Sequence, residues 1–215
     1  MISVPSITRR RSAGPGRPAS GERDILAATR RLLSGGANFT ELGVQQIATE
    51  AGVARSTFYA HFRDKVDLVM RLASDLVATS FSVASAWEPD EGVDRMAGAF
   101  QEVLGIYREH AGVVRAINEV AGYDATVRDF WNGRLGQFVD RTLAVLRVEQ
   151  EAGRVAASVD LVSVARIIVI GGERAIVDQI TAREPATDAA FARELAQTWW
   201  LGVYRRGPVE SRTVR

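Results

Sequence analysis

The sequence predicts an all-α protein of about nine helices, in which a three-helix N-terminal domain with a helix-turn-helix precedes a larger C-terminal helical domain. Three observations support this fold class. Apolar residues recur at helical spacing along most of the chain, and no segment alternates apolar and polar residues over the length of a strand. Glycine and proline fall at intervals where helices of ordinary length end.

The first three predicted helices are short and cover residues 22–34, 44–51 and 55–61. Gly35 follows the first of them, at the place where a glycine commonly ends a helix. Gly52 supplies the positive φ angle that a tight turn between two helices requires. The pattern therefore predicts two helices that are joined by a glycine turn.

Longer helices are predicted from Asp64 onward. Asp64 is a favourable N-cap, and Asp67 three residues later completes a start similar to a capping box, so this helix should run to Ala86. Pro89 and Gly92 oppose helix continuation and mark an interior linker. The remaining amphipathic stretches lie near 93–109, 112–121, 124–152, 160–183 and 187–206.

Composition narrows the class of protein. The absence of cysteine excludes disulfides, thiolate metal sites and cysteine nucleophiles, and we expect neither a metal nor a cofactor. The N-terminus lacks the apolar segment of a signal peptide, and the apolar run 167–172 is far short of the roughly 20 residues that span a bilayer. We therefore expect a cytoplasmic protein that does not contact a membrane.

Charge is distributed unevenly along the chain. Residues 1–71 hold 11 Arg and Lys against 6 Asp and Glu, whereas the rest of the chain is net acidic. A basic N-terminal third favours contact with a polyanion, most commonly nucleic acid. Residues 1–20, rich in Arg, Gly, Pro and Ser, are expected to form a flexible basic arm that reaches the DNA or is merely a solvated tail.

The segment from Val44 to Phe62 has the order of a helix-turn-helix. Five apolar residues would fill the small core between its helices: Ile47, Ala48, Val53, Phe58 and Phe62. Five others would be directed outward toward a DNA groove or phosphate: Arg55, Ser56, Thr57, Tyr59 and Ala60. The alternative is a three-helix packing unit in which Tyr59 and His61 are partly buried supports.

Residues 22–72 resemble the TetR family of bacterial regulators over its whole DNA-binding domain, through Ala28, Ile47-Ala48, Ala51-Gly52-Val53, Thr57-Phe58-Tyr59, Phe62 and Leu68. The resemblance implies further DNA contacts from Gly43, Gln45, His61 and Lys65. Lys65 is the only lysine among 27 basic residues, which favours a requirement for an ammonium group there; the alternative is a chance solvated lysine. Ala54 and Gly43 stand where the family usually has hydroxyl residues, so the recognition helix lacks its usual N-cap.

Three C-terminal segments, residues 129–155, 173–180 and 199–204, look like the mycobacterial subgroup of this family that represses ethionamide activation. The resemblance implies a mostly apolar channel, and together with the bulky residues on several predicted helices it suggests this lining set: Met96, Phe100, Val103, Tyr107, Trp131, Phe138, Val169, Gly172 and Trp199. Val169 and Gly172 stand where the subgroup has asparagines that hold a polar ligand group, which puts that anchor in doubt; Tyr107, Asn118 and Arg134 are the candidates to fix the orientation of a ligand here. These residues either surround a cavity or interlock as solid core.

The helix near 160–183 is apolar nearly all round, so it needs burial on more than one face. A homodimer through this helix and the one near 187–206 would satisfy it, as would a central position in a monomer. We expect an arm over 1–20, a DNA-binding domain over 21–67, an effector and dimerisation domain over 68–206 and a tail over 207–215.

These observations together predict a dimeric regulator, usually a repressor in this family, that binds a palindromic operator in double-stranded DNA and is released by a small apolar effector. One alternative is a constitutive DNA-binding dimer without an effector. An all-helical enzyme is the other, but the sequence has only two histidines and none of the common nucleotide-binding, zinc-protease or serine-hydrolase motifs.

Overall fold

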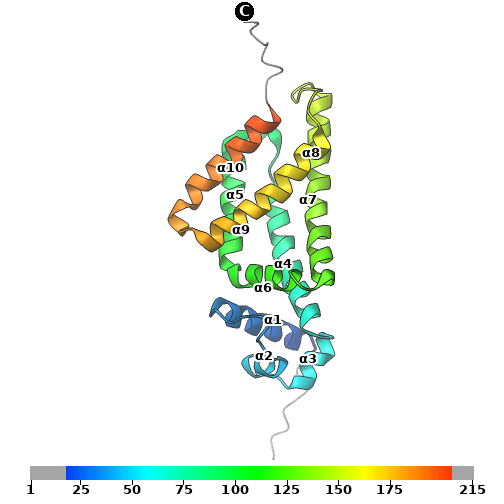
Figure 1. Ribbon diagram of the computed structural model, residues 1–215, viewed down its shortest axis with the longest axis vertical. Coiled ribbons are helices and arrows are strands. Elements are labelled where there is room, and N and C mark those ends of the chain that lie inside the picture. Colours follow the sequence, from blue (N-terminus) through cyan, green and yellow to red (C-terminus); the bar gives the residue numbers. More distant parts are fainter. Residues whose placement is uncertain (1–17, 205–215) are drawn as a thin grey trace, which may run out of the picture.

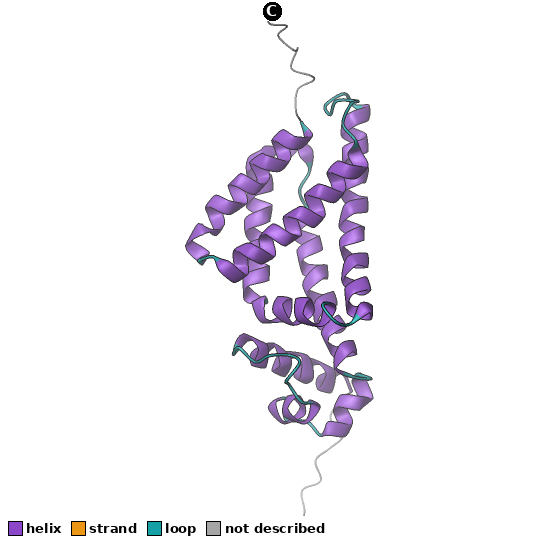
Figure 2. Ribbon diagram, viewed as in Figure 1, coloured by secondary structure: helices purple, strands orange, loops and turns teal. Residues whose placement is uncertain are grey.

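A computed structural model describes residues 18–204, and within that range it contains helices and loops and no strand (Figure 2). The α-helices are α1 (Pro18–Ser34), α2 (Val44–Glu50), α3 (Arg55–His61), α4 (Lys65–Ser85), α5 (Gly92–Glu109), α6 (Ala111–Ala121), α7 (Ala125–Glu151), α8 (Leu161–Arg166), α9 (Gly172–Ala182) and α10 (Asp188–Val203). A π-helical turn, η2 (Ile167–Gly171), joins α8 to α9 without a break, so the predicted all-α fold with nine helices is confirmed for these residues.

The three N-terminal helices form one end of the molecule (Figure 1). They share a core in which Ile25, Ile47 and Phe58 are fully buried. Gly52 has a φ of +68°, as the predicted turn between α2 and α3 requires. Helix α1 begins at Pro18 rather than Glu22, because proline is well suited to the first turn of a helix. Residues 18–20 are therefore helical instead of belonging to the arm; the rest of the arm and the tail lie outside the described residues.

Helix α4 connects the two ends of the molecule. It begins where predicted, with Asp64 accepting a hydrogen bond from the Asp67 N–H at 2.8 Å. Arg30 of α1 forms an ion pair with Asp75 of α4 at 2.7 Å. The length and hydropathy of α4 would also suit a membrane span, but its apolar residues lie in the core against α5, α6 and α7. Helix α4 therefore packs against both the N-terminal helices and the C-terminal helices.

Helix α6 lies across the junction between the N-terminal helices and the rest (Figure 1). Gly112 packs directly on Leu33, the penultimate residue of α1, and a Cβ at Gly112 would lie only 2.6 Å from the Leu33 carbonyl carbon and oxygen. Arg115 of α6 donates to the same Leu33 carbonyl at 3.2 Å. The end of α1 and the start of α6 are thus in close contact.

The C-terminal part is a helical bundle in which α10 packs along α5. Arg108 of α5 is bound to Asp188 of α10 at 2.6 Å and donates to the Ile180 and Arg183 carbonyls at the end of α9. The hydrogen bond from Arg108 is the main reason that the pKa of the Asp188 carboxyl is lowered. This cluster holds one end of α5, α9 and α10 together.

Candidate DNA-binding surface and ligand cavity

Helix α3 is anchored by one residue and exposes those around it. Phe58 is completely buried and makes ring contacts with Tyr59 and Phe62 at centroid distances of 5.4 and 5.5 Å. Because adjacent helical positions differ by about 100°, Tyr59 and Ala60 point away from the core that holds Phe58. The exposed residues of this helix are Arg55, Ser56, Tyr59 and Ala60, and Gln45 of α2 is exposed as well.

Arg55 and Tyr59 lie one turn apart on the same exposed face. The Arg55 guanidinium donates to the Tyr59 hydroxyl at 3.3 Å and lies 5.6 Å from its ring centroid. The pair presents a cation and a hydroxyl donor side by side. Such a pair can contact a phosphate or a guanine edge in a major groove.

Two residues of α3 are placed differently from the expectation that Thr57 faces outward and His61 contacts DNA. Both are half-buried, and both lie against α1, because a Cβ at Gly21 would meet the Thr57 methyl and the His61 Nε2 at 3.0 Å. They help to pack α3 on α1. The outward face of α3 is therefore narrower than the sequence suggested.

The ends of the helix-turn-helix lack side-chain caps. Gly43 and Ala54 are the N-caps of α2 and α3, and neither makes a side-chain capping bond. Ala54 has the extended conformation of an N-cap, with φ −71° and ψ 149°, so only the hydroxyl is missing. Gln45 is bonded within its own helix, to Thr49.

Lys65, at the start of α4, makes contacts within the protein. Its Nζ donates to the Thr40 carbonyl at 2.9 Å and lies 5.1 Å from the Phe39 ring centroid. Burial lowers the pKa of this ammonium, and the nearby Glu119 partly opposes the shift. Thr40 is itself bonded to Glu119 at the end of α6, so Lys65 belongs to the junction between the two parts of the chain.

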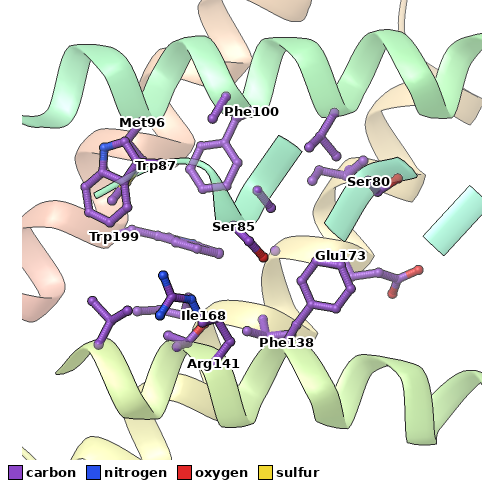
Figure 3. Close-up of a pocket in the computed structure, with 18 of the residues that line it drawn as sticks. Ser80, Ser85, Trp87, Met96, Phe100, Phe138, Arg141, Ile168, Glu173 and Trp199 are labelled. Carbon is purple, nitrogen blue, oxygen red and sulfur yellow. The ribbon is translucent and has the colours of Figure 1, made fainter. Parts of the chain in front are cut away.

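A cavity of about 170 Å³ lies inside the C-terminal bundle, between α4, α5, α7, the α8–α9 helix and α10. Figure 3 shows Met96 and Phe100 on one side of it and Phe138 and Ile168 on the other. Eight residues that the sequence placed in an effector channel line it: Met96, Phe100, Val103, Tyr107, Phe138, Val169, Gly172 and Trp199.

Aromatic side chains set the shape of the cavity. Phe100 and Trp199 meet edge to face at 4.7 Å, and Trp87 and Trp200 do so at 6.4 Å. A Cβ at Gly172 would lie 2.5 Å from the Trp199 ring, so this ring can approach α9 only because residue 172 is glycine. An asparagine cannot occupy this position while Trp199 stays in place.

Three residues expected in the channel do not line it. Asn118 is exposed on α6 and donates to the Val114 carbonyl. Arg134 stacks on Phe130 and donates to Ser74 Oγ at 3.1 Å. Trp131 is buried in the main core, where it lowers the pKa of the Glu173 carboxyl without being part of the cavity wall. The helical pattern could not place Asn118 and Arg134, because either face of their helices could have pointed inward.

The cavity includes polar residues that the sequence analysis missed. Ser80 and Ser85 of α4 line it, Arg141 lies at its edge, and Glu173 follows Gly172 on α9. Burial raises the pKa of the Glu173 carboxyl, while Arg174 and the hydrogen bond from Trp131 act in the opposite direction. The sequence could have indicated that Glu173 lines the cavity, since Glu173 follows Val169 by one helical turn on the same face.

Comparison with known proteins agrees with both parts of the site. Residues 25–72 match the family of bacterial regulatory proteins of the tetR type, and residues 96–205 match the C-terminal domain of the transcriptional regulator EthR. The EthR regulator of Mycolicibacterium smegmatis is 25% identical over 206 residues, covering 93% of each chain.

Solved structures share the fold. GusR of Salmonella enterica has a TM-score of 0.71 at 19% identity, with 87% of this chain and 97% of that chain covered. A Saccharomonospora viridis regulator in complex with choline has a TM-score of 0.69 at 18% identity, with 87% of this chain and 100% of that chain covered. The two family matches together cover the helix-turn-helix and most of the residues that line the cavity, and the chain belongs to the tetR family of DNA-binding transcriptional regulators, with a C-terminal domain of the EthR type.

Proposed function

We propose that the protein is a homodimeric repressor that binds a palindromic operator through α3 of each subunit and releases it when a small, largely apolar ligand enters the cavity. The observation that carries the proposal is that α4 belongs to both sites. It begins beside α3 at Lys65, and Val77, Ser80 and Ala84 further along it line the cavity. A regulator that binds chromosomal DNA in this way acts in the cytoplasm.

The DNA side of the proposal rests on the exposed end of α3. Arg55 and Ser56 lie in its first turn, where the recognition helix of a helix-turn-helix protein contacts base edges. Tyr59 is 48% exposed and offers a hydroxyl to a phosphate. Gly43 is the N-cap of α2 and Lys65 begins α4 directly after α3; we propose that both contribute backbone or phosphate contacts.

The dimer is supported by large apolar side chains that the chain itself leaves uncovered. Ile167 is 70% exposed, and Val162 and Ile170 on the same α8–α9 helix are 51% and 44% exposed. Leu201 of α10 is 65% exposed. In Figure 1 these two helices form the front of the C-terminal part. A second copy would cover both helices, and the two-fold symmetry would match a palindromic operator.

Coupling between the sites needs an element that differs between the free and the bound protein. A ligand that pushes α4 away from α5 or α7 would rotate the N-terminal end of α4, and α3 would move with it. An effect of about 1–3 kcal/mol, typical of allosteric coupling, weakens DNA binding by about 5- to 150-fold. The choline complex of the Saccharomonospora viridis regulator supports a small-molecule site in a protein of this fold.

The test begins with selection of duplexes from random DNA by the purified protein; the enriched duplex is called the operator below. Arg55→Ala should relax the sequence preference, whereas Tyr59→Phe should weaken binding to all sequences. Arg147→Ala, an exposed arginine on α7 outside both α3 and the proposed dimer surface, is the matched control and should leave binding unchanged. Apolar ligands that stabilise the protein are then added to the operator complex. Stabilising ligands that leave operator affinity unchanged contradict the effector part of the proposal.

One observation favours a second candidate, a DNA-binding dimer without an effector. The cavity volume of about 170 Å³ is below the range of about 300–1,000 Å³ that is usual for ligand sites. The two candidates differ in the last step of the same experiment. A constitutive dimer binds its operator equally well with every compound tested.

A further inference from the structure

Glu173 is the acidic side chain of a mostly apolar cavity, and its hydrogen bonding is incomplete. Its Oε1 is buried and has no hydrogen-bond partner among the described residues. A buried polar atom without a partner is costly and uncommon in folded proteins. Figure 3 shows the Glu173 carboxylate beyond the Phe138 ring, on the opposite side of the cavity from Arg141.

The charges around Glu173 do not neutralise it. Arg141 lines the far side of the cavity and is paired with Glu88 at 3.0 Å. Arg174 is adjacent in sequence but exposed, and within residues 18–204 it forms no ion pair with Glu173. From α5, Tyr107 contributes a neutral phenol whose pKa is raised by burial and by the Glu173 charge. The carboxyl therefore has an open position for a donor from a ligand.

We propose that the effector is a small amine, with a hydrophobic body about the size of one substituted ring and a protonated amino group that donates to Glu173 Oε1. This inference rests on the proposed function, because it takes the cavity as the effector site. The size follows from the volume: cavities of about 150 Å³ lined by apolar residues accept benzene, and this one holds about 170 Å³.

The aromatic residues that line the cavity suit a small amine with a hydrophobic body. The rings of Phe100, Phe138 and Trp199 surround the space for the hydrophobic body. Aromatic faces also attract a desolvated ammonium group. Gly172 lets the Trp199 ring lie against α9 one residue before Glu173, so both belong to the same part of the wall. The apolar part and the cationic part of the ligand thus each have a defined place.

The test compares three probes of similar shape and different charge: 2-phenylethylamine, 2-phenylethanol and 3-phenylpropionate. Binding to the full chain is measured by calorimetry and by the fluorescence of the tryptophans that line the cavity. The proteins are the wild type, Glu173→Gln, which keeps the shape and removes the charge, and Glu151→Gln, a control at an exposed carboxylate on α7. DNA release is measured separately with the operator.

The amine should bind the wild type most tightly, and Glu173→Gln should weaken its binding by about 10- to 100-fold, as expected for a hydrogen bond to a charged group. The alcohol should bind the wild type and Glu173→Gln equally, and Glu151→Gln should bind all three probes as the wild type does. Equal binding of all three probes, tightest binding of the acid, or an unchanged amine affinity in Glu173→Gln overturns this inference and leaves the cavity as a ligand site. If none of the probes binds any form, this inference is wrong as well, whereas the effector part of the proposed function is decided separately, by operator release with the other stabilising ligands.

Discussion

Replacing Gly112 by alanine tests whether the contact between α6 and α1 links the two parts of the protein. The new Cβ would lie 2.6 Å from the Leu33 carbonyl carbon and oxygen, where contacts below 3.0 Å are essentially never seen. Reaching an ordinary contact at 3.4 Å requires a shift of about 0.8 Å. Because the obstacle is backbone, α6 and α1 must move apart rather than one side chain rotating.

The expected cost is that of overpacking a core, about 1–3 kcal/mol. For a chain of this size it corresponds to a fall of about 2–12 °C in the melting temperature. The matched control is Gly105→Ala in α5, where nothing lies within 4 Å of the new Cβ. Alanine is a better helix former than glycine, so this change should raise stability by about 0.5–1 kcal/mol.

Two measurements are made on both variants. Urea unfolding tests the close contact between α6 and α1, and the anisotropy of a labelled operator tests whether this contact affects DNA binding. Gly112→Ala should unfold at a lower urea concentration and bind the operator at least about 5-fold more weakly, since the N-terminal helices shift against the bundle. Gly105→Ala should leave operator binding unchanged. Equal stability of the two variants would refute the close contact. A destabilised Gly112→Ala with normal DNA binding would refute the coupling through α6.

Three further predictions concern the cap, the cavity carboxyl and the outer face. Ala54→Ser should supply the missing hydroxyl to α3, raise the free energy of unfolding by about 1 kcal/mol and tighten operator binding; an unchanged urea midpoint would contradict this. Burial raises the folded-state pKa of Glu173, so the folded protein binds this proton more tightly than the unfolded chain, and stability is lost as pH rises through the raised value. Glu173→Gln should therefore increase the melting temperature near neutral pH, with a gain that shrinks toward pH 4.5; a gain independent of pH would refute the assignment. Ile167→Glu should give monomers in sedimentation equilibrium without loss of helix content, whereas Val148→Glu, at an exposed valine on α7, should not; dimers of Ile167→Glu would place the interface elsewhere.

The elements that the sequence predicted well are those with local causes. Asp64 caps α4 through its own side chain, and Gly52 has the positive φ that the turn needs. Phe58 and Ile47 are buried because their spacing puts them on one face of each short helix. These features depend on a few neighbouring residues, so a single sequence was enough to place them.

The features that were missed depend on which helix packs against which. Thr57 looked free on a short exposed helix, but the absence of a side chain at Gly21 lets α1 approach it. Arg134 was placed in the channel, yet the rotation of α7 directs it toward Ser74. Glu173 was missed, since the residues that it interacts with, Tyr107 and Trp131, lie on helices distant in the sequence.

The most direct test of the account is the operator affinity of the purified protein in the absence and presence of a cavity ligand, measured at one salt concentration. The account predicts an enriched palindromic duplex bound by a dimer through α3, and a loss of about 5- to 150-fold in affinity when 2-phenylethylamine or another stabilising ligand saturates the cavity. The same loss should be absent in a variant whose cavity no longer binds the ligand. If no duplex is preferred over random DNA, or if saturating ligand leaves the affinity unchanged, the protein is not a repressor that a cavity ligand releases from its operator.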